Sequence, residues 1–200
     1  VREESKQTRL GRGFFEQHRL QPGAIAATAL AVNRFANDAR ALKVESIRVL
    51  ATSAAREAIN PEDLVSAIQD ASGLALEIIS GEQEADWAFQ GVTTDPELAQ
   101  LPLLLLDVGG GSTEFILGHG EQKHFRQSFR LGTVRLLETI PPSDPPTKEE
   151  FSETREWIRQ FIAKKIVPEL QPALRREVAW HAAHRPVELV GTGGTTSGSG

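Results

Sequence analysis

Residues 103–118 read LLLLDVGGGSTEFILG. Four leucines run into Asp107, three glycines follow Val108, and a second apolar run begins after Glu114. Short apolar runs bounded by turn residues are typical of strands that are buried on both faces. We therefore predict two strands joined by a glycine hairpin. Because glycine has no side chain, the backbone N–H groups of such a hairpin can come close to an anion.

Two better-known phosphate loops do not fit this stretch. A dinucleotide-binding fingerprint needs a third glycine that opens a helix, whereas Glu114 stands at that position and a strand-like run follows. A Walker loop needs Gly-Lys followed by Ser or Thr, and this triplet does not occur in the sequence. Asp107 and Glu114 flank the glycines, where a divalent cation could offset phosphate charge. On the local pattern alone, a plain tight hairpin with two incidental carboxylates remains an alternative.

The composition is that of an ordinary globular protein, with 40% hydrophobic and 24% charged residues among 200. A chain of this length can form one large or two small domains with a real core. The formal net charge of −5 argues against general nucleic-acid binding, so an anionic ligand needs a local site. The absence of Cys excludes disulfides and thiolate metal sites and is consistent with the cytoplasm. The apolar runs are too short to cross a membrane, so we expect no membrane partner.

A strand is predicted at residues 47–52, followed at once by a short helix. Ligands of open α/β sheets bind at the carboxyl ends of strands, which places Arg56 near such a site. Arg56 could hold a phosphate through two hydrogen bonds, or it could pair with Glu57 or another carboxylate, and the sequence favours neither. Further along, Asn60 and Pro61 predict the start of the next helix, with Asn60 as its cap.

A second helix start follows a strand at residues 80–83, which have the Ser-x-x-Gln form of a capping box. The first turn carries Glu82 and Glu84, and the helix dipole alone favours acids there. Glu84 lies two positions past Glu82, nearly on the opposite side of the helix, and the apolar Ala85 and Phe89 mark the packed face beside it. A partly shielded carboxylate has a raised pKa and can act as a general base.

The last third of the chain adds one more candidate loop. Residues 147–150 form a capping box that predicts a helix start. Residues 187–190 read as a strand that runs into a second glycine-rich turn, which contains Gly191, Thr192, Gly193 and Gly194. The histidines show no metal-ligand spacing, and no Gly-x-Ser-x-Gly nucleophile motif is present.

Five blocks in order resemble the exopolyphosphatase / guanosine pentaphosphate phosphohydrolase family. They are ATSAAREA at 51–58, ISGEQEA at 79–85, DVGGGSTE at 107–114, SFRLGTVRL at 128–136 and GTGGT at 191–195. The resemblance covers almost the whole chain. It implies an α/β fold of the actin-like, sugar-kinase-like (ribonuclease H-like) phosphotransferase superfamily, in which two domains with mixed sheets face a cleft. We expect a partial N-terminal domain at residues 1–92 and a partial second domain, carrying the hairpin, at residues 93–200.

The resemblance also implies roles for single residues. Glu84 is expected to be the base that deprotonates a water, and Asp107 and Glu114 to hold Mg²⁺ (or Mn²⁺). The second phosphate-binding loop is expected to consist of Gly109, Gly110, Gly111, Ser112 and Thr113. Arg56 is expected to face the same cleft. Gln83 stands where many relatives carry another acid, but the adjacent Glu84 is kept.

The family's first phosphate loop is expected upstream of residue 1, and the end of the second domain after Thr195. Because the chain also contains no Met, we expect it to be a piece of a longer protein and to be weakly active or inactive alone. The resemblance allows a homodimer of the full-length protein.

The implied reaction is hydrolysis of terminal phosphoanhydride bonds, with release of orthophosphate from inorganic polyphosphate, guanosine pentaphosphate or both. Two alternatives stay open. One is an ATP-dependent kinase of the same superfamily, which transfers phosphate to a bound acceptor. The other is a non-catalytic sensor that binds guanosine tetra- or pentaphosphate.

Overall fold

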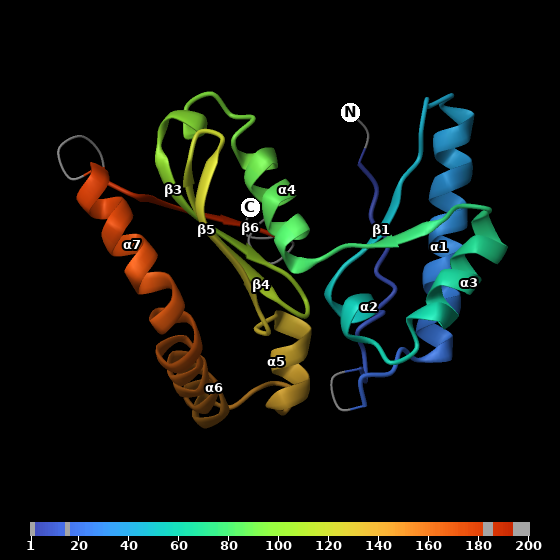
Figure 1. Ribbon diagram of the computed structural model, residues 1–200. Coiled ribbons are helices and arrows are strands. Elements are labelled where there is room, and N and C mark those ends of the chain that lie inside the picture. The colour runs from blue at the N-terminus through green and yellow to red at the C-terminus, as the bar shows by residue number, and fades with distance from the viewer. Residues whose placement is uncertain (1–2, 15–16, 182–185, 194–200) are drawn as a thin grey trace. The chain divides into compact units, whose positions relative to one another are not determined.

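The computed structural model describes residues 3–14, 17–181 and 186–193. The chain forms two compact units, Val1–Ser80 and Gly81–Gly200, each of which is described by itself (Figure 1).

The first unit is a small α/β layer. Its elements are α1 (Pro22–Ala41), β1 (Val49–Ala51), α2 (Ser53–Glu57), α3 (Pro61–Ser72) and β2 (Leu76–Ile78). Strands β1 and β2 pair in parallel, and α1 packs against α3. The core residues are Phe14, Leu20, Ile25, Ala29, Ala55, Leu64 and Ile68.

Helix α3 begins at Pro61 as predicted, with Asn60 at its N-cap position. Its side chain makes no cap hydrogen bond. Instead its Oδ1 accepts from Leu20 N at 2.9 Å and its Nδ2 donates to Leu20 O at 3.2 Å. Asn60 therefore holds the predicted N-cap position, but its amide satisfies a buried peptide group that is distant in sequence instead of the first turn of α3.

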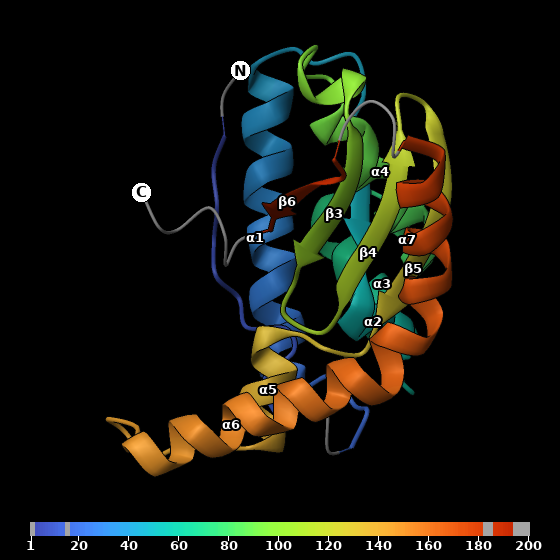
Figure 2. The ribbon, with the colours of Figure 1, turned by 90° about the vertical axis from the view of Figure 1, so that its left-hand side faces the viewer.

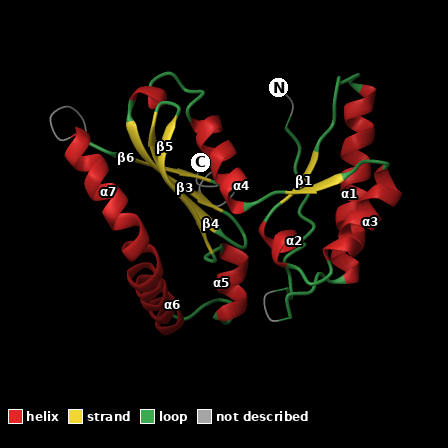
Figure 3. Cartoon of the chain, in the orientation of Figure 1, coloured by secondary structure: helices red, strands yellow, loops and turns green. Residues whose placement is uncertain are grey.

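The second unit is built on a mixed sheet (Figure 3). Its strand order is β5-β4-β3-β6 (Figure 2). Its strands are β3 (Pro102–Val108), β4 (Thr113–His119), β5 (Gln122–Phe129) and β6 (Glu188–Thr192). Its helical segments are α4 (Gly81–Val92), η1 (Leu98–Gln100), α5 (Thr133–Thr139), α6 (Lys148–Phe161), the π-helical η2 (Ile162–Ile166) and α7 (Val167–His181). Strands β3 and β4 are antiparallel, which confirms the predicted hairpin, whereas β3 and β6 are parallel. The predicted capping box at residues 147–150 is present at the start of α6.

Helices cover both faces of this sheet (Figure 1). On one face, Ala85 and Phe89 of α4 pack with Leu103, Leu105 and Ile116. The core on the opposite face contains Phe115, Phe129 and Ile166, with Leu104, Leu106, Phe125, Leu131, Phe161 and Leu170 packed against it. Burial on both faces explains why the apolar run of β3 does not alternate with polar residues.

Helix α4 packs with the second unit. It contacts β3, β4 and β5, and the boundary between the compact units falls directly before it, at residues 80 and 81. The sequence-based division at 92 and 93 had placed this helix at the end of the first domain. Its buried residues Ala85 and Phe89 pack against strands that come after the helix in the chain, the first of which, β3, begins at Pro102.

Candidate active site at the β3–β4 hairpin

The glycine turn of the hairpin is tied to the start of α5. Gly109 O accepts from Thr133 N at 3.1 Å, and Gly110 O accepts from Val134 N at 2.9 Å. Arg135 Nε donates to Gly111 O at 2.7 Å. These bonds need close backbone approach, because a Cβ on Gly132 would lie 2.4 Å from Gly110 O. The start of α5 therefore holds the glycine turn through hydrogen bonds to the three glycine carbonyl groups.

Four polar side chains form one row across the sheet at this end of the hairpin. Asp107 of β3 is directly opposite Glu114 of β4. Ser128 of β5 is opposite Glu114 on its other side, and Thr192 of β6 is the register partner of Asp107. Because side chains alternate along a strand, Asp107 and Glu114 share the face that α4 covers, the face of Leu105.

Glu114 is 1% exposed, and its pKa is raised to about 7. Burial is the main cause. The nearby charges of Glu84 and Asp107 raise the pKa further, whereas hydrogen bonds from Ser128 and Ser112 lower it. Ser128 Oγ donates to Glu114 Oε1 at 2.6 Å. Burial also raises the pKa of Asp107.

Glu84 lies in the first turn of α4 and is half-buried. Its charge raises the pKa of Glu114, so the Glu84 carboxylate lies within electrostatic range of Glu114, which Asp107 faces across the hairpin. We had expected Glu84 and the hairpin to come from opposite walls of a cleft. Both belong to the second unit, so this arrangement is made within one compact body.

The carboxylates are oxygen ligands of the kind that Mg²⁺ prefers. Within the described ranges, no group of three or more His, Cys, Asp or Glu residues is arranged to hold a metal ion. Mg²⁺ commonly takes one or two carboxylates, with waters and substrate phosphates completing its octahedron. Asp107 and Glu114 fit that pattern, since a cation between them would offset the burial of the Glu114 charge, the main cause of its raised pKa, and also its repulsion by Asp107.

The remaining hairpin residues differ in what their side chains do. Thr113 is buried and its hydroxyl donates to Leu131 O, which anchors the hairpin to the segment before α5. Ser112 is also buried and hydrogen-bonds to Glu114. Gly110 is exposed at the tip. Any phosphate contact from Thr113 would therefore come from its backbone.

The second glycine-rich turn lies against the first. A Cβ on Gly193 would be 2.5 Å from Val108 O and 2.8 Å from Asp107 Oδ1, and Gly193 has a φ of 101°. Only glycine tolerates both conditions. Gly191 and Thr192 end β6 beside β3, whereas Gly194 lies outside the described residues.

Arg56 belongs to the first unit. Its Nη1 donates to Ile79 O at 2.8 Å. Glu57 accepts a hydrogen bond from Ser53 Oγ at 3.0 Å. The role of Arg56 toward a phosphate stays a prediction.

Two residues of the site were not singled out from the sequence. Ser128 and Gly132 both fall within the SFRLGTVRL block, but their use depends on strand register and on backbone approach. Strict alternation along β5 would have indicated that Ser128 faces α4, had the register with β4 been known.

The fold and the site together define a class: an α/β protein with a glycine hairpin between two strands, flanked by carboxylates on one sheet face. Residues 1–192 match the model of the Ppx/GppA phosphatase family, and the chain belongs to that family. This confirms the expected family, and the observed α/β fold with a mixed sheet confirms the expected fold class.

Named relatives agree with this assignment. The chain is 37% identical over 202 residues to exopolyphosphatase 2 of Mycobacterium tuberculosis, covering 98% of this chain and 60% of the relative. It is 31% identical over 140 residues to exopolyphosphatase 1 of Mycobacterium bovis, covering 70% of this chain and 41% of the relative. The chain thus spans at most about 60% of the length of these relatives.

Solved structures of family members share the fold. An exopolyphosphatase from Cytophaga hutchinsonii has a TM-score of 0.85 at 26% identity, covering 98% of this chain and 59% of that one. The Ppx/GppA enzyme of Aquifex aeolicus has a TM-score of 0.65 at 31% identity, with the same coverage. Among the described helices, none has the length and apolar character required to span a bilayer.

Proposed function

We propose that the full-length protein is a phosphatase that hydrolyses terminal phosphoanhydride bonds and releases orthophosphate. Inorganic polyphosphate is the first candidate substrate, because the relatives at 37% and 31% identity are named exopolyphosphatases. Guanosine pentaphosphate is the second candidate substrate, because the family that the sequence resembles also includes guanosine pentaphosphate phosphohydrolases. The observation that carries the proposal is the pairing of Asp107 with Glu114 at a glycine turn that is hydrogen-bonded to α5, with the charge of Glu84 acting on Glu114.

In the proposed reaction, the hairpin backbone binds the terminal phosphate and Glu84 acts as the general base. The Glu84 carboxylate accepts a proton from a water while the water oxygen bonds to the terminal phosphorus. The bond from that phosphorus to the bridging oxygen breaks, and the electron pair leaves with the shortened chain. Hydrolysis of this kind depends on positioning and on charge neutralisation more than on covalent chemistry.

Mg²⁺ or Mn²⁺, held by Asp107 and Glu114, would offset the negative charge of the phosphates and of the leaving oxygen. The raised pKa of Glu114 supports this assignment. Three neighbouring carboxylates repel a polyanion, so the site suits a substrate that arrives with a divalent cation. Ser128 holds Glu114 Oε1 from β5, which fixes the orientation of that carboxylate on the side away from Asp107.

The test is a phosphate-release assay of the full-length protein with polyphosphate and guanosine pentaphosphate in parallel, with Mg²⁺ present or removed by a chelator. We expect orthophosphate release that depends on the metal. Phosphorylation of an acceptor without orthophosphate release would overturn the proposal in favour of a kinase. Tight binding of guanosine tetra- or pentaphosphate with no hydrolysis of either substrate would overturn it in favour of a sensor.

A further inference from the structure

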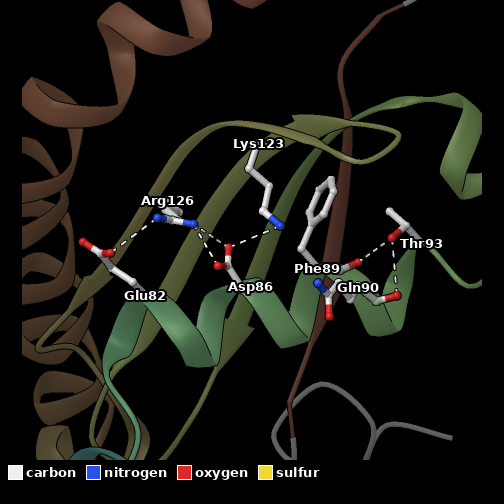
Figure 4. Close-up of polar contacts among 7 residues, drawn as sticks. All are labelled: Glu82, Asp86, Phe89, Gln90, Thr93, Lys123 and Arg126. Atoms are coloured by element: carbon white, nitrogen blue, oxygen red, sulfur yellow. Dashed lines mark hydrogen bonds and ion pairs between the residues drawn. The ribbon is translucent and has the colours of Figure 1, made fainter.

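A cluster of charges ties α4 to β5 outside the carboxylate site (Figure 4). Arg126 Nη1 donates to both carboxylate oxygens of Asp86, at 2.9 and 2.8 Å. Lys123 Nζ lies 3.4 Å from Asp86 Oδ1. The Asp86 and Lys123 side chains are only 22% and 18% exposed. We refer to Asp86, Lys123 and Arg126 as the α4–β5 clasp.

An irregularity in β5 is what brings both cations to Asp86. Lys123 and Arg126 are three residues apart, so in a regular strand they would point to opposite faces of the sheet. The register between β4 and β5 shifts at Leu117 and Gly118, where Leu117 pairs with Phe125 but Gly118 pairs with Lys123. The extra residue turns Lys123 to the face of Arg126, which is a known use of a β-bulge.

The apolar packing of α4 sets the depth of the helix on the sheet. The Phe89 side chain points from α4 toward the sheet (Figure 4). A Cβ on Gly118 would lie 2.9 Å from Phe89 Cζ. Ala85 is fully buried. At the other end, Thr93 Oγ1 donates to Phe89 O at 2.9 Å and closes the helix. The partly buried Ala88 and Val92 pack beside Ala85 and Phe89 and complete the apolar stripe. Because hydrophobic contacts are non-directional, a charged contact at the edge of the stripe can set the rotation of the helix about its axis.

Asp86 is well placed to fix that rotation. Successive residues of a helix are about 100° apart, so Asp86 and Glu84 lie about 100° on either side of Ala85. The two carboxylates thus flank the buried stripe. Asp86 is held by β5, while the charge of Glu84 acts on Glu114. Because both carboxylates belong to one helix, a rotation that releases Asp86 also moves Glu84.

We propose that Asp86 is a positioning residue, which acts through Arg126 and Lys123 to fix the rotation of α4 and thereby aims Glu84 at the β3–β4 hairpin. This inference rests on the proposed function, in which Glu84 is the base. A side chain reaches about 5–6 Å from the helix axis, so a rotation of about 10° displaces it by about 1 Å. A misplacement of that size can lower a rate by about 10²-fold.

The decisive comparison is Asp86→Asn against Glu82→Gln in the full-length protein. Both variants remove one carboxylate charge from α4. Glu82 is 71% exposed, and its contact with Arg126 Nη2 is long, at 3.5 Å. We therefore expect the loss of the Glu82 charge to have little effect on kcat. Asp86→Asn should lower kcat about 10-fold or more and leave KM within about 2-fold of the unmodified protein. Asp86→Glu, which keeps the charge, should restore part of kcat.

A purely structural role for the clasp gives a different result. In that case Asp86→Asn lowers the melting temperature but leaves kcat unchanged when the assay is run well below it, and the inference is overturned. Equal effects of Asp86→Asn and Glu82→Gln on kcat would also overturn it. If Asp86→Asn does not fold, Arg126→Gln is used with the same criteria, since its side chain is 40% exposed.

Glu84→Gln separates this inference from the proposed function. If Glu84→Gln is inactive and Asp86→Asn keeps full kcat, only the positioning role fails. If Glu84→Gln keeps full kcat, the base is another residue and the positioning role fails with it, whatever Asp86→Asn does. The proposed function fails separately, if the unmodified full-length protein releases no orthophosphate. If both hold, Asp86→Asn should cause no further loss of kcat in a Glu84→Gln background, because residues that act as a unit are not additive.

Discussion

Asp107 and Glu114 lie directly opposite each other across the β3–β4 ladder, at the two ends of the glycine turn. Like charges in that relationship destabilise a sheet, and here one of them is 1% exposed. Ser128 offers Glu114 one hydrogen bond, but the pKa of Glu114 still rises to about 7. A costly pair of this kind, beside a glycine turn that is held rigid from α5, is typical of a functional site.

We expect Glu84→Gln to lower turnover of the full-length protein by about 10²–10⁴-fold, the usual contribution of a general base. The amide keeps the size of the side chain but cannot take a proton from water. Substrate affinity should change little, since the base acts mainly in the transition state. Steady-state kinetics together with a binding measurement test this. Unchanged turnover would mean that the base is another residue.

Glu114→Ala should raise the Mg²⁺ concentration needed for half-maximal activity. The substitution removes one of the two carboxylates suited to the cation and leaves Asp107 alone. A titration of activity with Mg²⁺ measures the effect, and Ser128→Ala serves as a milder comparison because it removes only the hydrogen bond that orients Glu114. An unaltered Mg²⁺ requirement in Glu114→Ala would assign the metal to other ligands.

Stability should depend on pH through Glu114 when no metal is present. Its pKa is near 4.5 in the unfolded chain and about 7 in the fold, so between these values the folded state binds more protons. The free energy of unfolding should therefore fall as pH rises from about 4.5 to about 7, and stay at the lower level above that. Glu114→Gln should flatten this part of the profile. Melting temperatures from pH 4.5 to 8, with chelator, give the comparison, and parallel profiles for both proteins would contradict the prediction.

The hairpin could be predicted from the sequence because its signals are local. The apolar runs on both sides of the glycines fix the strands, and Pro61 marks a helix start where the structure has it. The capping box of Thr147 and Glu150 is likewise complete within four residues.

The parts that could not be predicted depend on contacts between distant segments. Helix α4 follows β2 closely in the chain, but its partner surface is the later β3–β5 sheet. Asn60 has the local pattern of a cap, yet its amide serves Leu20, forty residues away. Ser128 became a site residue only through its register with Glu114. The local sequence pattern predicts which helix or strand a segment forms. The roles of α4, Asn60 and Ser128 depend on which distant segments they contact.

Gly132→Ala should damage the site from outside the hairpin. The added Cβ would lie 2.4 Å from Gly110 O and 2.6 Å from Gly111 C, and backbone atoms cannot yield as a flexible side chain can. We expect a loss of stability of about 1–3 kcal/mol, as for other overpacked positions, and a fall in turnover because the turn shifts away from α5.

Gly91→Ala is the matched control. A Cβ there meets nothing within 4 Å, and alanine in a helix is favoured over glycine by about 1 kcal/mol. Denaturant unfolding should therefore show a loss of stability in Gly132→Ala and a gain in Gly91→Ala. Phosphate release should fall in Gly132→Ala and stay near that of the unmodified protein in Gly91→Ala. A Gly132→Ala protein as stable and active as Gly91→Ala would show that the hairpin does not depend on its contact with α5.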